Sequence, residues 1–150
     1  MKLFAKTRLA RLWIMLLFAS LSMISVSVLS FAVTIGQRYA GGIVFYVDES
    51  RQHGLVAAMR DLPGKYEWQG AKEACERSVY GGFSDWYLPS KWELNELYTH
   101  KNKVGGFSDH FYWSSSGYIA DFAWFQIFGD GSQIGYYKYN NLRVRPVRAF

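Results

Sequence analysis

An uncharged apolar run near the N-terminus decides which part of this chain can form a globular core. Residues 12–32 contain no charged side chain, and the eleven residues before them hold four basic residues and no acidic one. A basic segment followed by an apolar segment that ends in small residues is typical of a secretory signal peptide. We therefore predict a signal peptide over residues 1–32 and a single domain over residues 33–150.

The same run also permits a second interpretation, an uncleaved N-terminal membrane anchor. It is 21 residues long, and about 20 apolar residues span a bilayer. Five serines dilute its second half, which favours cleavage. In both interpretations the positive flank stays inside and the remaining chain crosses the membrane. We therefore expect an exported protein of the cell envelope, surface or medium, or one anchored in the inner membrane, with membrane contact only through residues 1–32.

Most of the excess positive charge belongs to this first segment. The sequence has 17 basic and 12 acidic residues, and four of the basic residues lie within residues 1–32. Residues 33–150 are therefore close to neutral, which gives no argument for a nucleic-acid partner. The remaining basic residues crowd the C-terminus, where Lys138, Arg143, Arg145 and Arg148 have no acid among them.

The order of the local patterns predicts an α+β fold, with two helices packed on a mostly antiparallel sheet. Apolar runs at 43–47 and 54–59 predict a hairpin. Two helices follow, at 69–79 and from Ser90, where Ser90 and Glu93 form a capping box. Four further strands are expected at 111–116, 122–128, 134–139 and 142–147, with turns at Asp130-Gly131 and Asn140-Asn141.

Two single residues refine this picture. Pro146 indicates that the last strand lies at an edge or is interrupted, because proline cannot donate to a ladder. Cys75 is the only cysteine, so no intrachain disulfide forms. It shares a helical face, expected to point inward, with Ala71, Ala74, Ser78 and Val79. This position favours a small buried hydrophobe over a reactive thiolate.

No set of residues has the spacing of a catalytic or metal site. No two of His53, His100 and His110 have the i, i+4 spacing of a metal-binding pair, and only one cysteine could join them, whereas a zinc site needs three or four converging ligands. The run Ser114 to Ser116 lacks the glycines of a nucleophile elbow and is better explained by satisfied polar groups beside an aromatic strand. We therefore expect no enzyme, no metal and no other cofactor.

The C-terminal basic residues and the tyrosines among them form the candidate ligand site. Tyr137 and Tyr139 share a face of a strand, as Arg143 and Arg145 do. Aromatic faces stack on apolar ligand surfaces, and guanidinium groups bind sulfate or carboxylate with two N–H groups. The predicted ligand-binding residues are Lys138, Arg143, Arg145, Arg148, Tyr137 and Tyr139. The alternative is that these arginines pair internally with Asp85, Asp109, Asp121 or Asp130, because buried charges must be paired.

One short motif occurs twice. Gly81-Gly82-Phe83-Ser84-Asp85 recurs as Gly105-Gly106-Phe107-Ser108-Asp109. The residues that flank the two copies differ, so the repeated motif indicates a reused loop rather than a repeat architecture.

Several segments together resemble the Lcl C-terminal domain family, named from a bacterial collagen-like adhesin. They are Ile35-Gly36-Gln37 with Tyr39 and Gly41-Gly42-Ile43-Val44-Phe45-Tyr46, Asp85-Trp86-Tyr87-Leu88-Pro89-Ser90 with Glu93-Leu94, Tyr112-Trp113-Ser114-Ser115-Ser116, and Val144-Arg145-Pro146-Val147-Arg148. The resemblance runs from about residue 35 to the end. It implies a C-type-lectin-like fold, an adhesive role and sulfated glycosaminoglycans as ligands.

This chain departs from the family pattern in two ways. Tyr87 stands where the family usually has arginine, which removes any ion pair at that position, and the collagen stalk is absent. We therefore expect an exported, non-enzymatic lectin-like module, an adhesin-type binder of sulfated or acidic polysaccharide. The alternative is a structural or protein-binding envelope module without glycan binding. The sequence does not define an oligomeric state.

Overall fold

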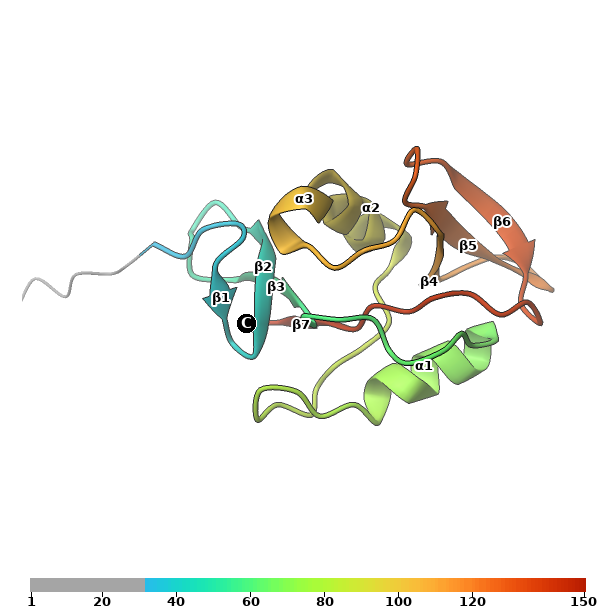
Figure 1. Cartoon of the computed structure of the whole chain (residues 1–150), viewed down its shortest axis with the longest axis horizontal. Helices are drawn as coiled ribbons and strands as arrows, with labels where there is room; N and C mark the ends of the chain where they lie inside the picture. The colour runs from blue at the N-terminus through green and yellow to red at the C-terminus, as the bar shows by residue number, and fades with distance from the viewer. Residues whose placement is uncertain (1–31) are drawn as a thin grey trace, which may run out of the picture. The chain divides into compact units, whose positions relative to one another are not determined.

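The computed structural model describes residues 32–150, so the predicted signal peptide lies almost entirely outside the described residues. The described part is α+β with two antiparallel sheets (Figure 1). The sequence predicted the class and the antiparallel pairing, but one sheet instead of two. Within residues 32–150 no helix has both the length and the hydropathy needed to cross a membrane.

The first sheet contains four strands in the order β1-β2-β3-β7. The strands are β1 (Arg38–Tyr39), β2 (Gly42–Val47), β3 (Gly54–Ala57) and β7 (Val147–Ala149). The predicted hairpin is confirmed by the antiparallel pairing of β2 with β3. The C-terminal strand completes this sheet by pairing with β3.

The second sheet is a meander of β4 (Phe111–Ile119), β5 (Phe122–Ile127) and β6 (Gln133–Tyr137). The predicted turn at Asp130-Gly131 joins β5 to β6, and the Asp130 carboxylate accepts a hydrogen bond from the Ser132 amide. This bond lowers the pKa of Asp130. In Figure 1, β5 and β6 extend beyond α2 at one end of the described part.

Three helices pack against these sheets: α1 (Trp68–Glu76), α2 (Lys91–Thr99) and the short α3 (Lys101–Val104). The capping box of α2 is confirmed, since Ser90 accepts from the Glu93 amide and Glu93 accepts from the Ser90 amide. Tyr87 joins this cap by donating to the Glu93 carboxylate at 2.8 Å. A hydrogen bond thus occupies the position where the family pattern has arginine.

Helix α1 confirms most of the predicted inward face. Ala71, Cys75 and Ser78 are buried, but Val79 is 67 % exposed. The prediction for Val79 is wrong because the helix ends at Glu76, so the chain leaves helical register before residue 79. Burial raises the pKa of the Cys75 thiol to about 12, as expected for a core cysteine.

The C-terminal segment differs most from the sequence prediction. A continuous strand over residues 142–147 is wrong, because Leu142 and Arg143 form only isolated bridges, to Tyr66 and Tyr112. The regular strand β7 begins directly after Pro146, which confirms that this proline interrupts the strand. The segment therefore runs from the three-stranded sheet to the four-stranded sheet and joins them (Figure 1).

Among residues 32–150 the buried hydrophobic side chains form three clusters. Helix α2 buries Leu94 and Leu97 against Phe45, while α1 buries Cys75 against Trp113 of the three-stranded sheet. A third cluster lies around Trp86 and Val56. Burial of such large side chains contributes roughly 1.5–3 kcal/mol each, which explains how a domain without a disulfide holds two sheets together.

Candidate binding surfaces

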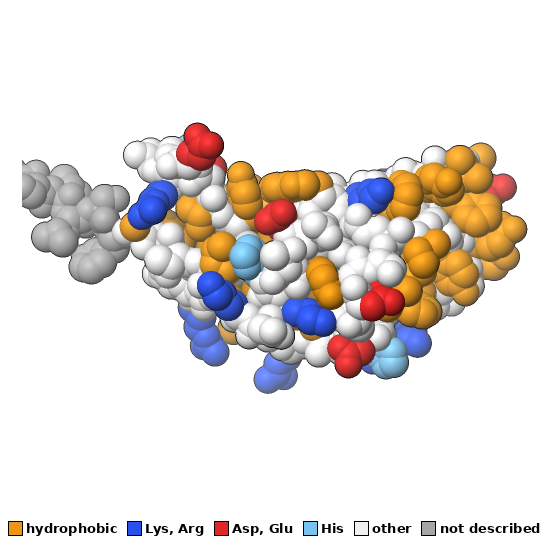
Figure 2. Space-filling view, turned by 90° about the horizontal axis from the view of Figure 1, so that it is seen from above, with side chains coloured by type: hydrophobic (Ala, Val, Ile, Leu, Met, Phe, Trp, Pro, Cys, Tyr) orange, Lys and Arg blue, Asp and Glu red, His pale blue; other side chains and the backbone are white. Residues whose placement is uncertain are grey.

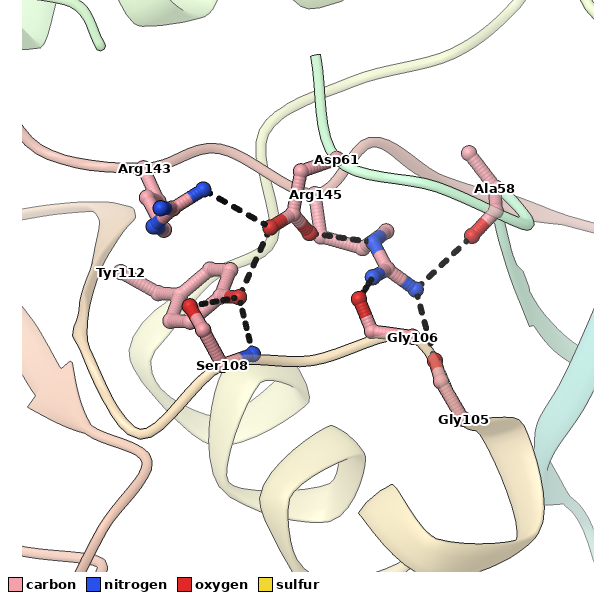
Figure 3. A network of polar contacts seen from close by, with 8 residues as sticks. All are labelled: Ala58, Asp61, Gly105, Gly106, Ser108, Tyr112, Arg143 and Arg145. Atoms are coloured by element: carbon pink, nitrogen blue, oxygen red, sulfur yellow. Dashed lines mark hydrogen bonds and ion pairs between the residues drawn. The ribbon is translucent and has the colours of Figure 1, made fainter. Parts of the chain in front are cut away.

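Arg145 is the most buried charged residue among residues 32–150, with 1 % of its surface exposed. Its guanidinium group donates to the Asp61 carboxylate at 2.7 Å and to three backbone carbonyl oxygens (Figure 3). Those oxygens belong to Ala58, Gly105 and Gly106, at 3.1, 3.2 and 2.6 Å. Four of the five N–H groups of Arg145 are therefore occupied inside the domain.

Asp61 also serves two other side chains in this network. Tyr112 donates its hydroxyl to Asp61 at 2.8 Å, and burial raises the pKa of Tyr112. The Nη1 atom of Arg143 lies 3.8 Å from Oδ2 of Asp61, the same oxygen that accepts from Tyr112 (Figure 3). Its Nε atom is buried without a hydrogen-bond partner. Two guanidinium groups thus share one carboxylate, which leaves one positive charge in excess.

Arg148 has a similar internal partner. Its Nε and Nη2 atoms donate to the two oxygens of Asp85 at 2.7 and 2.9 Å, and Nη1 donates to the Ala40 carbonyl at 3.0 Å. These hydrogen bonds hold the pKa of Asp85 below its usual range. Of the predicted internal partners, Asp85 is thus confirmed, while the partner of Arg143 and Arg145 is Asp61.

The repeated Gly-Gly-Phe-Ser-Asp motif explains where these arginines lie. The guanidinium of Arg148 sits 3.9 Å from the ring centre of Phe83, and that of Arg145 sits 3.9 Å from the ring centre of Phe107. Both loops also have two consecutive glycines with positive φ, a conformation that L side chains rarely adopt. Each copy of the motif therefore supports one C-terminal arginine.

The remaining predicted site residues lie on the three-stranded sheet. Tyr137 and Tyr139 share an exposed surface as predicted, with ring centres 5.1 Å apart and ring planes 19° apart. Lys138 points elsewhere: it donates to the Ala120 carbonyl at 2.6 Å and covers the Trp68 ring at 4.6 Å. The six predicted residues are therefore divided among the interior, two sides of this sheet and the partly exposed Arg143.

Two serines of the candidate nucleophile run, Ser114 and Ser116, make hydrogen bonds that support the fold. Ser114 is buried and donates to the Trp124 carbonyl at 2.8 Å, while Ser116 accepts from the Lys91 amide at 2.9 Å. Within residues 32–150 no three His, Cys, Asp or Glu side chains approach closely enough to hold a metal ion.

A pocket of about 450 Å³ lies where β1, the residues after β3 and the end of α3 meet. Sequence reasoning missed it because its two arginines, Arg38 and Arg60, are isolated in the sequence and meet only through the topology. A second pocket of about 310 Å³ shares Arg38, Gly41 and Met59 with the first. We call the two pockets together the basic groove. Its lining is Arg38, Tyr39, Ala40, Gly41, Gly42, Ile43, Met59, Arg60, Tyr80, Gly81, Val104, Gly105 and Gly106.

The basic groove and the buried arginine network share a wall. Gly105 and Gly106 line the groove, and their carbonyl oxygens accept hydrogen bonds from Arg145 behind them. Gly81, which also lines the groove, lies so close to Gly41 that a Cβ atom on Gly81 would be 2.4 Å from the Gly41 Cα atom. Arg145 therefore fixes one wall of the groove, while Arg38 and Arg60 face the solvent.

These features place residues 32–150 in the class of small α+β modules with two antiparallel sheets. The C-terminal arginines are paired internally, and the basic groove is open to solvent. The chain belongs to the family described as the Lcl C-terminal domain, which matches residues 47–148. The match begins later than residue 35, where the sequence motifs begin, so β1 and most of β2 precede it. A search of curated proteins found no match.

Proposed function

We propose that this chain is an exported, non-enzymatic module with a lectin-like fold, which binds sulfated or acidic polysaccharide in the basic groove. One observation carries the proposal. Arg38 and Arg60 are both exposed and line one pocket. Neither has a carboxylate within ion-pair distance among residues 32–150. Membership of the Lcl C-terminal domain family supports the ligand class.

The charges around the groove favour an anion. Asp61 and Asp85, the acids nearest to Arg60 and Gly81 in the sequence, are already paired with buried arginines. The Asp61 network behind Gly105 and Gly106 has one excess positive charge. A concave surface lined by one sign of charge raises the local concentration of the opposite ion.

The groove also offers apolar contacts of the kind that a sugar ring needs. Tyr39, Met59 and Tyr80 are exposed large side chains in its lining. Guanidinium groups bind the flat oxygen pairs of sulfate or carboxylate with two parallel hydrogen bonds. Exposed contacts of this kind contribute at most about 1 kcal/mol each, so binding is expected to be weak and sensitive to salt.

Heparin-affinity chromatography tests the proposal. The full chain, which starts at Met1, is expressed, and the form that remains after processing by the host is purified. We expect the Arg38→Ala/Arg60→Ala double variant to elute at clearly lower salt than the wild type. The matched control is Lys65→Ala/Arg77→Ala, which removes the same charge from exposed positions outside the groove.

Two results would contradict the proposal. If both double variants elute from heparin at the same, lower salt concentration, heparin is attracted to the net charge of the protein and not to a specific site. A wild-type protein that is never retained at low salt would favour the alternative, a structural or protein-binding envelope module.

A further inference from the structure

The outer half of the three-stranded sheet has a row of aromatic side chains that no described element covers. Helix α2 packs over the inner half, where Gln126 is buried and donates to Asn95. Beyond it, the exposed fractions reach 53 % for Tyr118 and 64 % for Tyr139. Figure 2 shows hydrophobic side chains gathered at the end that carries β5 and β6. We call this set the aromatic row; its members are Tyr118, Phe122, Trp124, Tyr137 and Tyr139.

The rings of the aromatic row hold one another in place. Tyr118 contacts Trp124 with ring centres 4.7 Å apart, and Phe122 contacts Tyr137 at 4.1 Å. Tyr139 continues the row by stacking on Tyr137. Aromatic contacts of this kind restrict the rotamers of exposed rings, so less conformational entropy is lost when a ligand binds.

A glycine makes room for this arrangement. Tyr118 lies across Gly135 of β6, where a Cβ atom would be 2.5 Å from the Cδ1 atom of Tyr118. The ring therefore lies close to the sheet and does not stand away from it. The result is a low, broad surface of aromatic carbon with phenolic hydroxyls on three of its five members.

The charges beside the aromatic row are few and of both signs, since Lys138, between Tyr137 and Tyr139 in the chain, is turned to the Ala120 carbonyl and the Trp68 ring. Lys91 lies 3.3 Å from the ring centre of Trp124 at the inner end. Asp121, which is exposed, directly precedes Phe122 at the outer end. A strongly charged ligand of either sign would meet one like charge, so charge complementarity favours a neutral ligand.

We propose that the aromatic row stacks against the pyranose rings of a neutral polysaccharide, at a site separate from the basic groove. A pyranose has an apolar face of C–H groups and a rim of hydroxyls. The apolar face matches the rings, and the rim matches the phenolic hydroxyls and the Lys91 amine. An apolar protein surface would instead strip water from these polar groups, which costs free energy when no new hydrogen bond forms.

Affinity electrophoresis in gels that contain hydroxyethylcellulose tests this inference, with cellohexaose as a soluble competitor. The chain is expressed from Met1 and purified as the host processes it. We expect the polysaccharide to retard the wild type, with little change between low and high salt. Tyr118→Ala and Tyr139→Ala should each weaken binding about fivefold or more, because each removes one stacked ring. Tyr139→Phe keeps the ring and loses only the hydroxyl, so it should weaken binding much less than Tyr139→Ala does.

Two controls separate this site from the basic groove. Tyr39→Ala removes an exposed tyrosine at the four-stranded sheet and should not change the retardation. Tyr118→Ala and Tyr139→Ala should keep the heparin elution of the wild type. The two proposals can therefore fail independently.

Three outcomes would overturn the inference. The inference fails if the polysaccharide does not retard the wild type, and it fails if the alanine variants are retarded as strongly as the wild type. Sedimentation that shows a wild-type dimer and a Tyr139→Ala monomer would assign the row to a second copy of the chain. Tyr139 lies in an exposed turn and Tyr118 in β4, and thermal unfolding of each variant shows whether it folds as the wild type does.

Discussion

The two Gly-Gly-Phe-Ser-Asp loops, residues 81–85 and 105–109, perform the same task in different surroundings. Each places its phenylalanine ring against a C-terminal guanidinium at the same distance, 3.9 Å. The first loop also supplies the carboxylate, because Asp85 binds Arg148 with both oxygens. In the second loop Asp109 stays exposed, and Arg145 obtains its carboxylate from Asp61.

This difference shows that the more deeply buried arginine needs more hydrogen-bond partners, although the same motif supports both. Asp85 has 60 % of its side chain exposed, so water can replace the hydrogen bonds that Arg148 donates to it. Arg145 lies deeper and binds three carbonyl oxygens as well as Asp61. A buried charge is tolerated only when it is both paired and hydrogen-bonded. The two loops should therefore differ in how much stability depends on their arginines.

The largest effect is expected for Arg145→Ala. Removal of this guanidinium leaves Asp61 with the Tyr112 hydroxyl and, as its remaining cation, Arg143 at 3.8 Å. It also deprives three carbonyl oxygens of a donor, of which that of Ala58 is buried. Loss of one partner from a buried pair costs about 3–5 kcal/mol. Urea denaturation followed by tryptophan fluorescence measures this free energy of unfolding. A loss below about 1 kcal/mol, the range of an exposed pair, would show that the network adds little.

Arg148→Ala should have a smaller effect on the same measurement. We expect a loss of about 1–2 kcal/mol, because the exposed Asp85 regains water while the Ala40 carbonyl loses a donor. The comparison between the loops fails if Arg148→Ala is as destabilising as Arg145→Ala.

The smallest effect concerns pH. Arg148 lowers the pKa of Asp85 in the folded state, so this contribution to stability is fully present above the unfolded pKa, about 3.9. It is lost as the pH falls through the lower folded pKa. Asp85→Asn should therefore flatten part of the acid limb of the stability curve.

Asp109→Asn is the matched control, because Asp109 holds the equivalent place in the second loop and makes no ion pair there within residues 32–150. Melting temperatures recorded between pH 2 and pH 7 compare the variants. An acid limb that is the same for Asp85→Asn and the wild type would contradict the proposed role of the Asp85–Arg148 pair.

Local signals in the sequence predicted much of the fold. The capping box of Ser90 and Glu93, the turn at Asp130-Gly131 and the burial of Cys75 each depend on residues close together in the chain. The division into two sheets was not predictable in this way. Strand patterns show which side chains point inward, but not which strands pair.

The candidate sites depended on contacts between distant residues. Arg145 and Asp61 are 84 residues apart, and no local pattern joins them. The crowded C-terminal arginines suggested a ligand site, whereas Arg38 and Arg60 were inconspicuous. The repeated motif was visible in the sequence, but its contact with the arginines was not. Tyr137 and Tyr139 were predicted to share a face of a strand over residues 134–139. Their rings do stack, but that strand is too long, because β6 ends at Tyr137 and Tyr139 lies in the turn that follows.

The central claim is that the C-terminal arginines support the interior and do not form the ligand surface. The Arg143→Ala/Arg145→Ala double variant tests it most directly, through its free energy of unfolding and its heparin retention. We expect a loss of at least about 3 kcal/mol, because Asp61 keeps no cationic partner. A variant that keeps the unfolding free energy of the wild type and loses heparin retention would contradict the claim.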